Sequence, residues 1–218
     1  MAVACVGLGF WQVRRLHDRR VLNATILERR EAPAIAVDRS ATGLQPFRSV
    51  VVRGTYDPEH EVLVYGASLD GSPGDLLVTP LRLDDGSGVL VIRGWVPFSI
   101  DRAPVAEAAP PTEPVEVRGF LVEDEGDGSS RPDANGVVPR LDVAGIASDV
   151  PYDVYPLPVQ LTEQDPERTT RLPVPMPPPA LSEGPHLSYA IQWFSFATIA
   201  VVGAILLLHR ERRARASP

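Results

Sequence analysis

The chain of 218 residues has one cysteine and no lysine. Cys5 alone cannot form an internal disulfide framework, and with only four histidines in the chain it excludes a zinc finger or an iron–sulfur cluster. All 21 basic residues are Arg. Proline is abundant, with 23 residues, which excludes an all-helical chain and is typical of strands, turns and linkers.

The net charge of −7 is unevenly distributed. The two ends are basic, because residues 1–30 hold six Arg against two acids and residues 209–218 hold four Arg against one. The long middle is therefore strongly acidic. An acidic body argues against nucleic acid as a partner, since phosphates need a cationic face. Basic ends beside apolar runs indicate a membrane instead.

A long apolar run occupies residues 187–208, which contain no charge and no proline. At about 1.5 Å per residue this helix would span roughly 33 Å, enough for a bilayer core of about 30 Å. Tyr189 and Trp193 lie near its start, where amphipathic rings favour the membrane interface. The sequence predicts a transmembrane helix here, followed by a cytoplasmic basic tail at residues 209–218; a buried core helix is the alternative.

A shorter apolar run occupies residues 1–13, about 20 Å of helix and too short to span a bilayer. No basic segment precedes it and no small-residue cleavage site follows it, so a secretory signal peptide fits poorly. The Arg residues that follow would place that end inside the cell, in conflict with the last helix. We interpret Met1 as an internal start, residues 1–13 as a truncated first transmembrane helix, and residues 14–31 as a juxtamembrane helix.

Between the two runs, residues 32–170 indicate a β-rich domain. Six apolar, β-branched segments are bounded by Gly, Pro or Asp, at residues 47–56, 61–65, 76–83, 89–98, 115–122 and 152–161. Residues 84–88 form a short hairpin connection between two of them. With no helical crossovers between the strands, the pattern predicts an antiparallel sheet or small barrel, so the chain is expected to be an α+β membrane protein.

Three further segments of the middle have distinct compositions. Residues 123–136 are acidic with Gly and Ser and indicate a mobile loop. Residues 140–150 favour one short helix. Residues 171–186 are proline-rich and are predicted to form a semi-rigid extended linker that leads to the last helix.

No catalytic motif is complete. Residues 66–70 have Asp where a nucleophile elbow needs its second Gly, and residues 7–9 lack the third Gly of a dinucleotide loop. No two histidines have metal-ligand spacing. We therefore expect a protein that is not an enzyme; a membrane-anchored hydrolase would need a nucleophile–base pair that the sequence does not show.

Four stretches together resemble the Surfeit locus protein 1 (Shy) family. Residues 9–16, Gly-Phe-Trp-Gln-Val-Arg-Arg-Leu, are similar to the Trp-Gln-x-x-Arg-Leu end of its first membrane helix. Gly74 with residues 78–81 resembles its Gly-x-x-Val-x-Thr-Pro-Leu stretch, and residues 89–97 resemble its Leu-Val-x-Arg-Gly-Trp-Val-Pro strand. Residues 186–194 resemble the His-Leu-x-Tyr-Ala-x-Gln-Trp-Phe opening of its last helix.

The resemblance implies a membrane-bound assembly factor for aa3-type cytochrome c oxidase that acts when haem a enters the large catalytic subunit. It further implies two transmembrane helices, both termini in the cytoplasm of a bacterium, and an extracytoplasmic β-rich domain at the plasma membrane. The expected partners are the oxidase large subunit, haem a synthesis enzymes and membrane lipid, with no nucleic acid. The alternative is a permanent accessory subunit of the oxidase or respiratory supercomplex, without a role in handling haem.

Arg93 and Trp95 are the candidate partner-binding residues. Strand alternation places both side chains on one face, where a planar cation could lie beside the ring. They form either a satisfied structural pair within the sheet or a docking edge for the oxidase or for haem propionates.

His186 is the candidate haem iron ligand, since a neutral imidazole is a common axial ligand. On a helix it shares one stripe with Tyr189, Ala190, Trp193 and Ala197. The two small alanines would let a flat macrocycle approach, with Tyr189 and Trp193 at its sides. Trp11 and Gln12 could complete the pocket wall. The alternative is that His186 only caps the helix at the interface.

Overall fold

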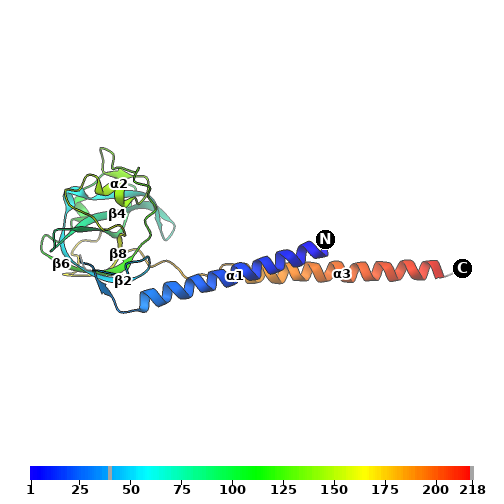
Figure 1. The fold of residues 1–218 in the computed structure, drawn as a ribbon. Coiled ribbons are helices and arrows are strands. Elements are labelled where there is room, and N and C mark those ends of the chain that lie inside the picture. Colours follow the sequence, from blue (N-terminus) through cyan, green and yellow to red (C-terminus); the bar gives the residue numbers. More distant parts are fainter. Residues whose placement is uncertain (39–40, 217–218) are drawn as a thin grey trace. The chain divides into compact units, whose positions relative to one another are not determined.

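The structure, a computed structural model, describes residues 1–38 and 41–216. The chain divides into two units, each of which is described by itself (Figure 1). The helical unit consists of Met1–Leu27 and Pro179–Pro218, and the β unit consists of Glu28–Pro178.

The elements follow one another in an order that brackets the strands between two long helices. They are α1 (Ala2–Glu31), β1 (Ile35–Ala36), β2 (Ser49–Tyr56), β3 (Val62–Leu69), β4 (Ser72–Leu83), β5 (Gly88–Pro97), β6 (Val115–Leu121), β7 (Val137–Val138), α2 (Val143–Ala147), β8 (Val159–Asp165) and α3 (His186–Ala216). Two short 3₁₀ helices, Pro58–His60 and Ala106–Ala108, lie in the loops after β2 and β5.

Five strands of the β unit close into a ring. β2 pairs with β6, β6 with β8, β8 with β5, β5 with β4, and β4 returns to β2. All these pairs are antiparallel except β5–β8, which is parallel. The small barrel predicted from the strand pattern is therefore present. The expectation of a purely antiparallel sheet is wrong at β5–β8, and also at the short pairs β1–β2 and β3–β7.

The long strand β4 makes the closure possible because one of its edges pairs with two strands, while the other edge pairs with β5. Its first part pairs with β3, and its last residues pair with β2, where Gly54 stands opposite Leu83. A Cβ atom at Gly54 would lie 2.2 Å from the backbone oxygen of Arg82. The two strands can therefore approach at this seam only because residue 54 has no side chain.

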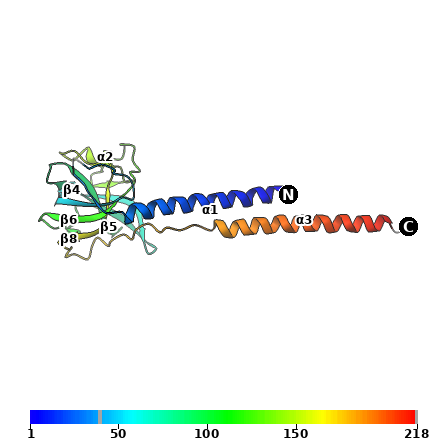
Figure 2. The ribbon, with the colours of Figure 1, turned by 60° about the horizontal axis from the view of Figure 1, so that its bottom comes forward.

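The core lies on both faces of β5. Val89 and Val91 point into the barrel interior with residues of β2, β6 and β8, whereas Leu90 and Ile92 pack on the other face with α2 and its flanks. Figures 1 and 2 show α2 above β4 on the outside of the sheet. Burial on both faces explains why this strand is a continuous apolar run rather than an alternating one.

The strand boundaries differ most from expectation at the β3–β4 turn and at the start of β8. β3 extends to Leu69 and β4 begins at Ser72, so both strands are longer than predicted and the turn between them is shorter. β8 begins only at Val159, whereas Gly88 bridges Val154 in the segment before it. The short helix predicted at residues 140–150 is α2.

The acidic loop at residues 123–136 is tied to the start of α2, in contrast to the mobile loop expected. The Asp142 carboxylate accepts hydrogen bonds from the backbone N–H groups of Gly128, Ser130 and Gly145, at 2.9–3.1 Å. Burial opposes ionisation of Asp142, but these donors outweigh it and lower its pKa below the ordinary value.

The proline-rich segment is only partly a spacer. Val174 exchanges two backbone hydrogen bonds with Trp95, and Leu172 packs against the core cluster that includes Leu63, Leu77 and Val96. The first residues of the predicted linker therefore belong to the β unit, and the division between units falls between Pro178 and Pro179.

The helical unit is built from two long helices. α1 is one continuous helix over the residues expected to form a truncated span and a separate juxtamembrane helix. α3 begins one residue before the predicted span and continues through the described part of the basic tail. Among the described residues one helix is long and apolar enough to cross a membrane, His186–Arg213, whose most apolar window has a mean hydropathy of 2.1.

Candidate functional site

One face of each long helix is buried within the helical unit. On α1 four of the five buried residues recur at spacings of four, three and four, which keeps them in one stripe: Cys5, Gly9, Gln12 and Leu16. The covered residues of α3 have the same spacing: His186, Ala190, Trp193 and Ala197. The two stripes pack against each other in an antiparallel helix pair, and both ribbon views show the helices side by side (Figures 1 and 2).

Aromatic rings and a glycine hold the middle of the pair. The rings of Phe10 and Phe194 meet edge to face, with centroids 5.4 Å apart. A Cβ atom at Gly9 would lie 2.6 Å from the Phe194 ring, so the ring occupies the place of a side chain at this position. Close packing of this kind fixes how α1 and α3 are aligned.

The pair has one polar contact at the start of α3. The ring nitrogen Nδ1 of His186 lies 2.8 Å from Oε1 of Gln12. Gln12 is buried, with 8% of its surface exposed, and His186 is half-buried. An amide oxygen can only accept, so Nδ1–H donates, and in a neutral imidazole held this way the lone pair is on Nε2.

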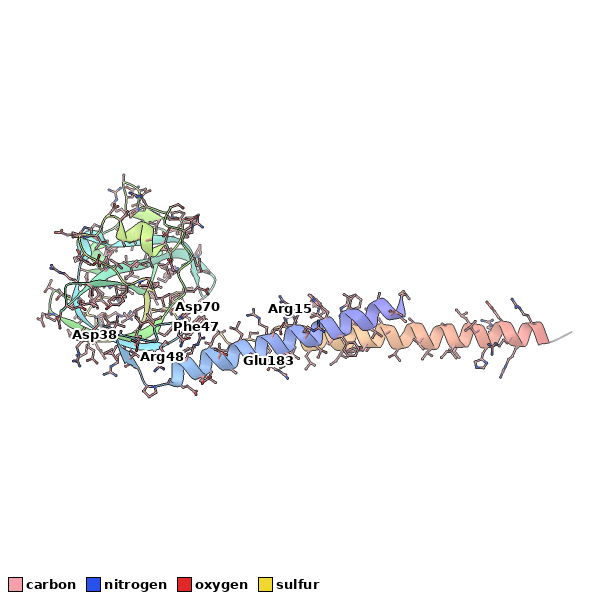
Figure 3. The ribbon with its side chains drawn as sticks, viewed as in Figure 1. Arg15, Asp38, Phe47, Arg48, Asp70 and Glu183 are labelled. Atoms are coloured by element: carbon pink, nitrogen blue, oxygen red, sulfur yellow. The ribbon has the colours of Figure 1, made fainter. Side chains whose placement is uncertain are left out.

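The second ring nitrogen of His186, Nε2, lies near Gly184. A Cβ atom at Gly184 would lie 3.5 Å from Nε2, and Gly184 has none. Among the described residues Nε2 makes no hydrogen bond. Just before it, Glu183 accepts two hydrogen bonds of 2.9 Å from Arg20 of α1; Figure 3 labels Glu183 at this point.

The other residues of the predicted haem site are only partly brought together. Tyr189 is 47% exposed, and Trp193 meets Phe196 edge to face. Ala190 and Ala197, which were expected to let a macrocycle approach, are 2% and 5% exposed within the helix pair. Trp11 is 52% exposed, whereas its neighbour Gln12 faces α3.

Arg93 lies in a buried cluster of the β unit, the Glu61 cluster, formed by Tyr56, Glu61, Thr79 and Arg93. Arg93 donates to Oε2 of Glu61 at 3.1 Å, and Thr79 donates to the same oxygen. The backbone N–H of Val105 donates to the other oxygen at 2.8 Å. The guanidinium lies 5.2 Å from the centre of the Tyr56 ring.

Burial dominates the electrostatics of the Glu61 cluster. The side chains of Arg93 and Glu61 are 2% and 1% exposed. Burial lowers the pKa of the Arg93 guanidinium and Glu61 opposes this, while burial raises the pKa of the Tyr56 hydroxyl well above its ordinary value. This burial favours a structural role for Arg93 within the sheet, because a guanidinium inside the protein is not at a docking edge.

Trp95 does not meet Arg93, because the strand alternation breaks between them. Gly94 has φ +149°, and the pairing of β4 with β5 shifts register there, so that Arg93 has no direct partner on β4. The ring that Arg93 meets is that of Tyr56. The indole nitrogen of Trp95 is buried beside Gly74 and has no hydrogen-bond partner among the described residues.

A family model described as "SURF1 family" matches residues 1–198, nine-tenths of the chain. The chain belongs to the SURF1 family. A SURF1-like protein of Rickettsia bellii is 28% identical over 92% of this chain and 84% of its own length. One from Rickettsia felis is 26% identical over 94% and 92%, and an uncharacterized SURF1-like protein of Mycobacterium tuberculosis is 29% identical over 82% and 65%.

The four SURF1-like stretches fall into two structural groups. Two of them, residues 9–16 and 186–194, supply both partners of the His186–Gln12 contact and the Phe194 ring. The other two lie on β4 and β5 and supply Thr79 and Arg93 of the Glu61 cluster. The SURF1 resemblance therefore marks one partly exposed polar contact and one buried structural cluster.

Sequence reasoning missed three contributors to these groups. Glu61 was not singled out, because its partners lie 18 and 32 residues along the chain and nothing local connects them. Gly184 carries a weak signal, because a glycine two residues before a candidate ligand permits a close approach of the backbone. The break at Gly94 could have been anticipated from an isolated glycine within a strand.

The described residues show no cluster of three or more His, Cys, Asp or Glu side chains that could hold a metal ion. His60 contacts Asp57 at 2.8 Å, and Asp57 also accepts from the Tyr152 hydroxyl at 2.9 Å. These hydrogen bonds connect the segment before β8 to the loop after β2, which is a structural contact within the β unit.

Proposed function

We propose that this SURF1-family chain is a membrane-bound assembly factor for aa3-type cytochrome c oxidase, which assists haem a insertion into the large catalytic subunit or stabilises that subunit. The observation that carries the proposal is the His186–Gln12 contact at the start of the apolar helix, in a chain of this family. The role is a non-enzymatic one: the chain holds and delivers a cargo.

The membrane part of the proposal is supported by α3 and its flanks. The apolar helix is followed by a basic tail, which favours a cytoplasmic C-terminus. The apolar first half of α1 packs antiparallel to α3 and would form part of a second span, so that the β unit stands outside the cytoplasm of a bacterial cell. Membrane lipid, the oxidase large subunit and haem a synthesis enzymes are the partners expected of such a factor.

The residues at the start of α3 fit haem a as a cargo in one respect. His186 offers an imidazole whose Nδ1 is occupied and whose Nε2 makes no hydrogen bond with a described residue. When bound, haem iron accepts an imidazole as an axial ligand. The covered alanine face does not fit the macrocycle, which leaves Tyr189 and Trp193 as the aromatic residues available to it.

Deletion of the gene tests the proposal. A reduced-minus-oxidised spectrum of membranes from the deletion strain should show a weaker haem a signal, together with lower oxidase activity. A normal haem a signal with normal oxidase activity would contradict the assembly role.

A permanent accessory subunit is the second candidate, favoured by the exposed surface of α3, which a neighbouring membrane helix could cover. Purified oxidase distinguishes the two. Recovery of this chain in equal amount with the catalytic subunits means a subunit, and recovery in traces means an assembly factor.

The orientation is tested separately with external protease on intact spheroplasts. We expect the protease to degrade the β unit and to leave the Arg-rich C-terminal tail intact, as detected with an antibody to that tail. Degradation of the β unit only after lysis would reverse the orientation.

A further inference from the structure

We propose that Gln12 is the positioning residue of the haem site: it holds the His186 imidazole in the tautomer and orientation that present Nε2 to iron. The inference rests on the proposed function, since it concerns the same cargo. It assigns to α1 a chemical role in binding, in place of the passive wall expected from the sequence.

The hydrogen bond itself is the first step. A Gln side chain can accept through Oε1 at 2.8 Å from Nδ1, so the proton of the neutral ring resides on Nδ1. In that tautomer the lone pair of Nε2 is free to bind iron. A partner that accepts from the other ring nitrogen also makes the ligand more basic and fixes the ring plane.

The burial of Gln12 is the second step. A polar side chain that is 8% exposed, in a stripe with Gly9 and Leu16, loses hydration and needs a partner. His186 is the partner that the structure gives it. The alternative is a structural role, in which the hydrogen bond only aligns the two helices. The packing of Phe194 against Gly9 and Phe10 already aligns them.

The open side of His186 is the third step. The ring edge opposite Gln12 lies near Gly184, and Nε2 makes no hydrogen bond with a described residue. One ring nitrogen is therefore held and the other has no partner among the described residues, which is the arrangement of a ligand imidazole and not of a ring satisfied on both sides.

Titration of the detergent-solubilised full chain with iron protoporphyrin IX, followed by absorbance, tests the inference. Gln12→Leu removes the acceptor at similar volume and should weaken binding by about 10- to 100-fold. Gln12→Glu keeps an oxygen at the same reach and should restore the affinity, with a lower midpoint potential of the bound iron. The matched control is Gln192→Leu, an exposed glutamine of α3, which should bind as the parent does.

A second measurement separates positioning from helix packing. In the iron-free protein, ¹⁵N NMR of the His186 ring should show a proton on Nδ1 in the parent and in Gln12→Glu, and a mixture of tautomers in Gln12→Leu. Circular dichroism should show the same helix content in all variants.

Two different failures can be told apart. If His186→Ala abolishes binding but Gln12→Leu binds as the parent does, the positioning role is wrong and the proposed function stands. If the parent does not bind the porphyrin, or His186→Ala binds it unchanged, both the haem site and the role of Gln12 are wrong. If porphyrin binding fails in this way but ¹⁵N NMR still shows a proton on Nδ1 of His186, the His186–Gln12 hydrogen bond serves helix packing alone.

Discussion

The two polar contacts built from SURF1-like stretches differ in how completely their groups are satisfied. In the Glu61 cluster both carboxylate oxygens accept hydrogen bonds, from Arg93 and Thr79 on one side and from the Val105 backbone on the other. In the helix pair His186 uses one ring nitrogen and leaves the other open. The first contact is buried and closed, whereas the second is half-buried and has a free position.

The difference separates structure from function among residues that the sequence presents alike. A buried network in which both carboxylate oxygens accept hydrogen bonds stabilises the barrel and is shielded from a partner. An imidazole held through one ring nitrogen has the other nitrogen left for the proposed cargo. Substitutions in the β unit should therefore change stability, and substitutions in the helix pair should change binding.

The largest effect is expected from Glu61→Leu, which leaves Arg93 as an unpaired buried charge. The free energy of unfolding of the β unit should fall by about 3–5 kcal/mol. Chemical unfolding of the full chain in detergent, followed by near-ultraviolet circular dichroism, measures it. The double variant Glu61→Leu with Arg93→Met should lose less than the single variant, because no uncompensated charge remains.

Glu116→Gln is the matched control for that prediction. Glu116 pairs with Arg53 and Arg118 at the surface, where screening by solvent makes ion pairs weak. Its loss should cost less than about 1 kcal/mol. Equal losses from Glu61→Leu and Glu116→Gln would show that the Glu61 cluster is not the closed network described.

Gly54→Ala tests the closure of the barrel, with a smaller effect. The new Cβ would meet the Arg82 backbone oxygen, which cannot rotate away, so strands β2 and β4 must separate. We expect a loss of up to about 3 kcal/mol in the same unfolding experiment. Gly7→Ala, at an open helical position outside the β unit, is the control and should leave the unfolding of the β unit unchanged. If Gly54→Ala leaves the free energy of unfolding unchanged, the ring of strands is not closed between β2 and β4.

Asp142→Asn should cost about 1–2 kcal/mol, because an amide oxygen is a weaker acceptor for the backbone donors at the start of α2. The pKa of Asp142 is lowered in the folded chain, so its contribution is present above the ordinary pKa of 3.8 and is lost as the pH falls through the folded value. The difference between parent and variant in unfolding free energy should therefore shrink in acid. A difference that is constant from neutral pH to strong acid would refute this assignment.

Gly9→Ala should have the smallest effect, and it tests the helix pair, the second of the two contacts compared. Its Cβ meets the end of the Phe194 ring, which can move aside, so the helices shift only slightly. Porphyrin affinity should fall by less than about fivefold, equivalent to under about 1 kcal/mol, while the unfolding of the β unit is unchanged. A loss as large as that of Gln12→Leu would assign the role of Gln12 to helix packing.

Much of the barrel could be predicted from local pattern. The β-branched segments between turn residues indicated the main strands, and the doubly buried β5 was visible as a continuous apolar run. The parallel pairing of β5 with β8 and the two-residue strands β1 and β7 could not be predicted, because they depend on contacts distant in sequence. The alternation of side chains along β5 predicted that Arg93 and Trp95 share a face, and the bulge at Gly94 interrupts that alternation.

The candidate site was predictable in part for the same reason. Helical spacing placed His186 and Trp193 in one stripe, and the structure shows that stripe turned toward α1. The sequence could not show that Ala190 and Ala197 are covered, since their cover is another helix more than 170 residues away. Nor could it show that Gln12 reaches His186, because the antiparallel alignment sets that distance.

One measurement tests most directly the claim that the helix pair handles haem a. A deletion strain is complemented with the parent chain, with His186→Ala or with the control Gln192→Leu, and the reduced-minus-oxidised spectrum of its membranes is recorded at equal protein level. The account predicts a full haem a signal with the parent and the control, and a reduced signal with His186→Ala. A full haem a signal with His186→Ala would contradict it.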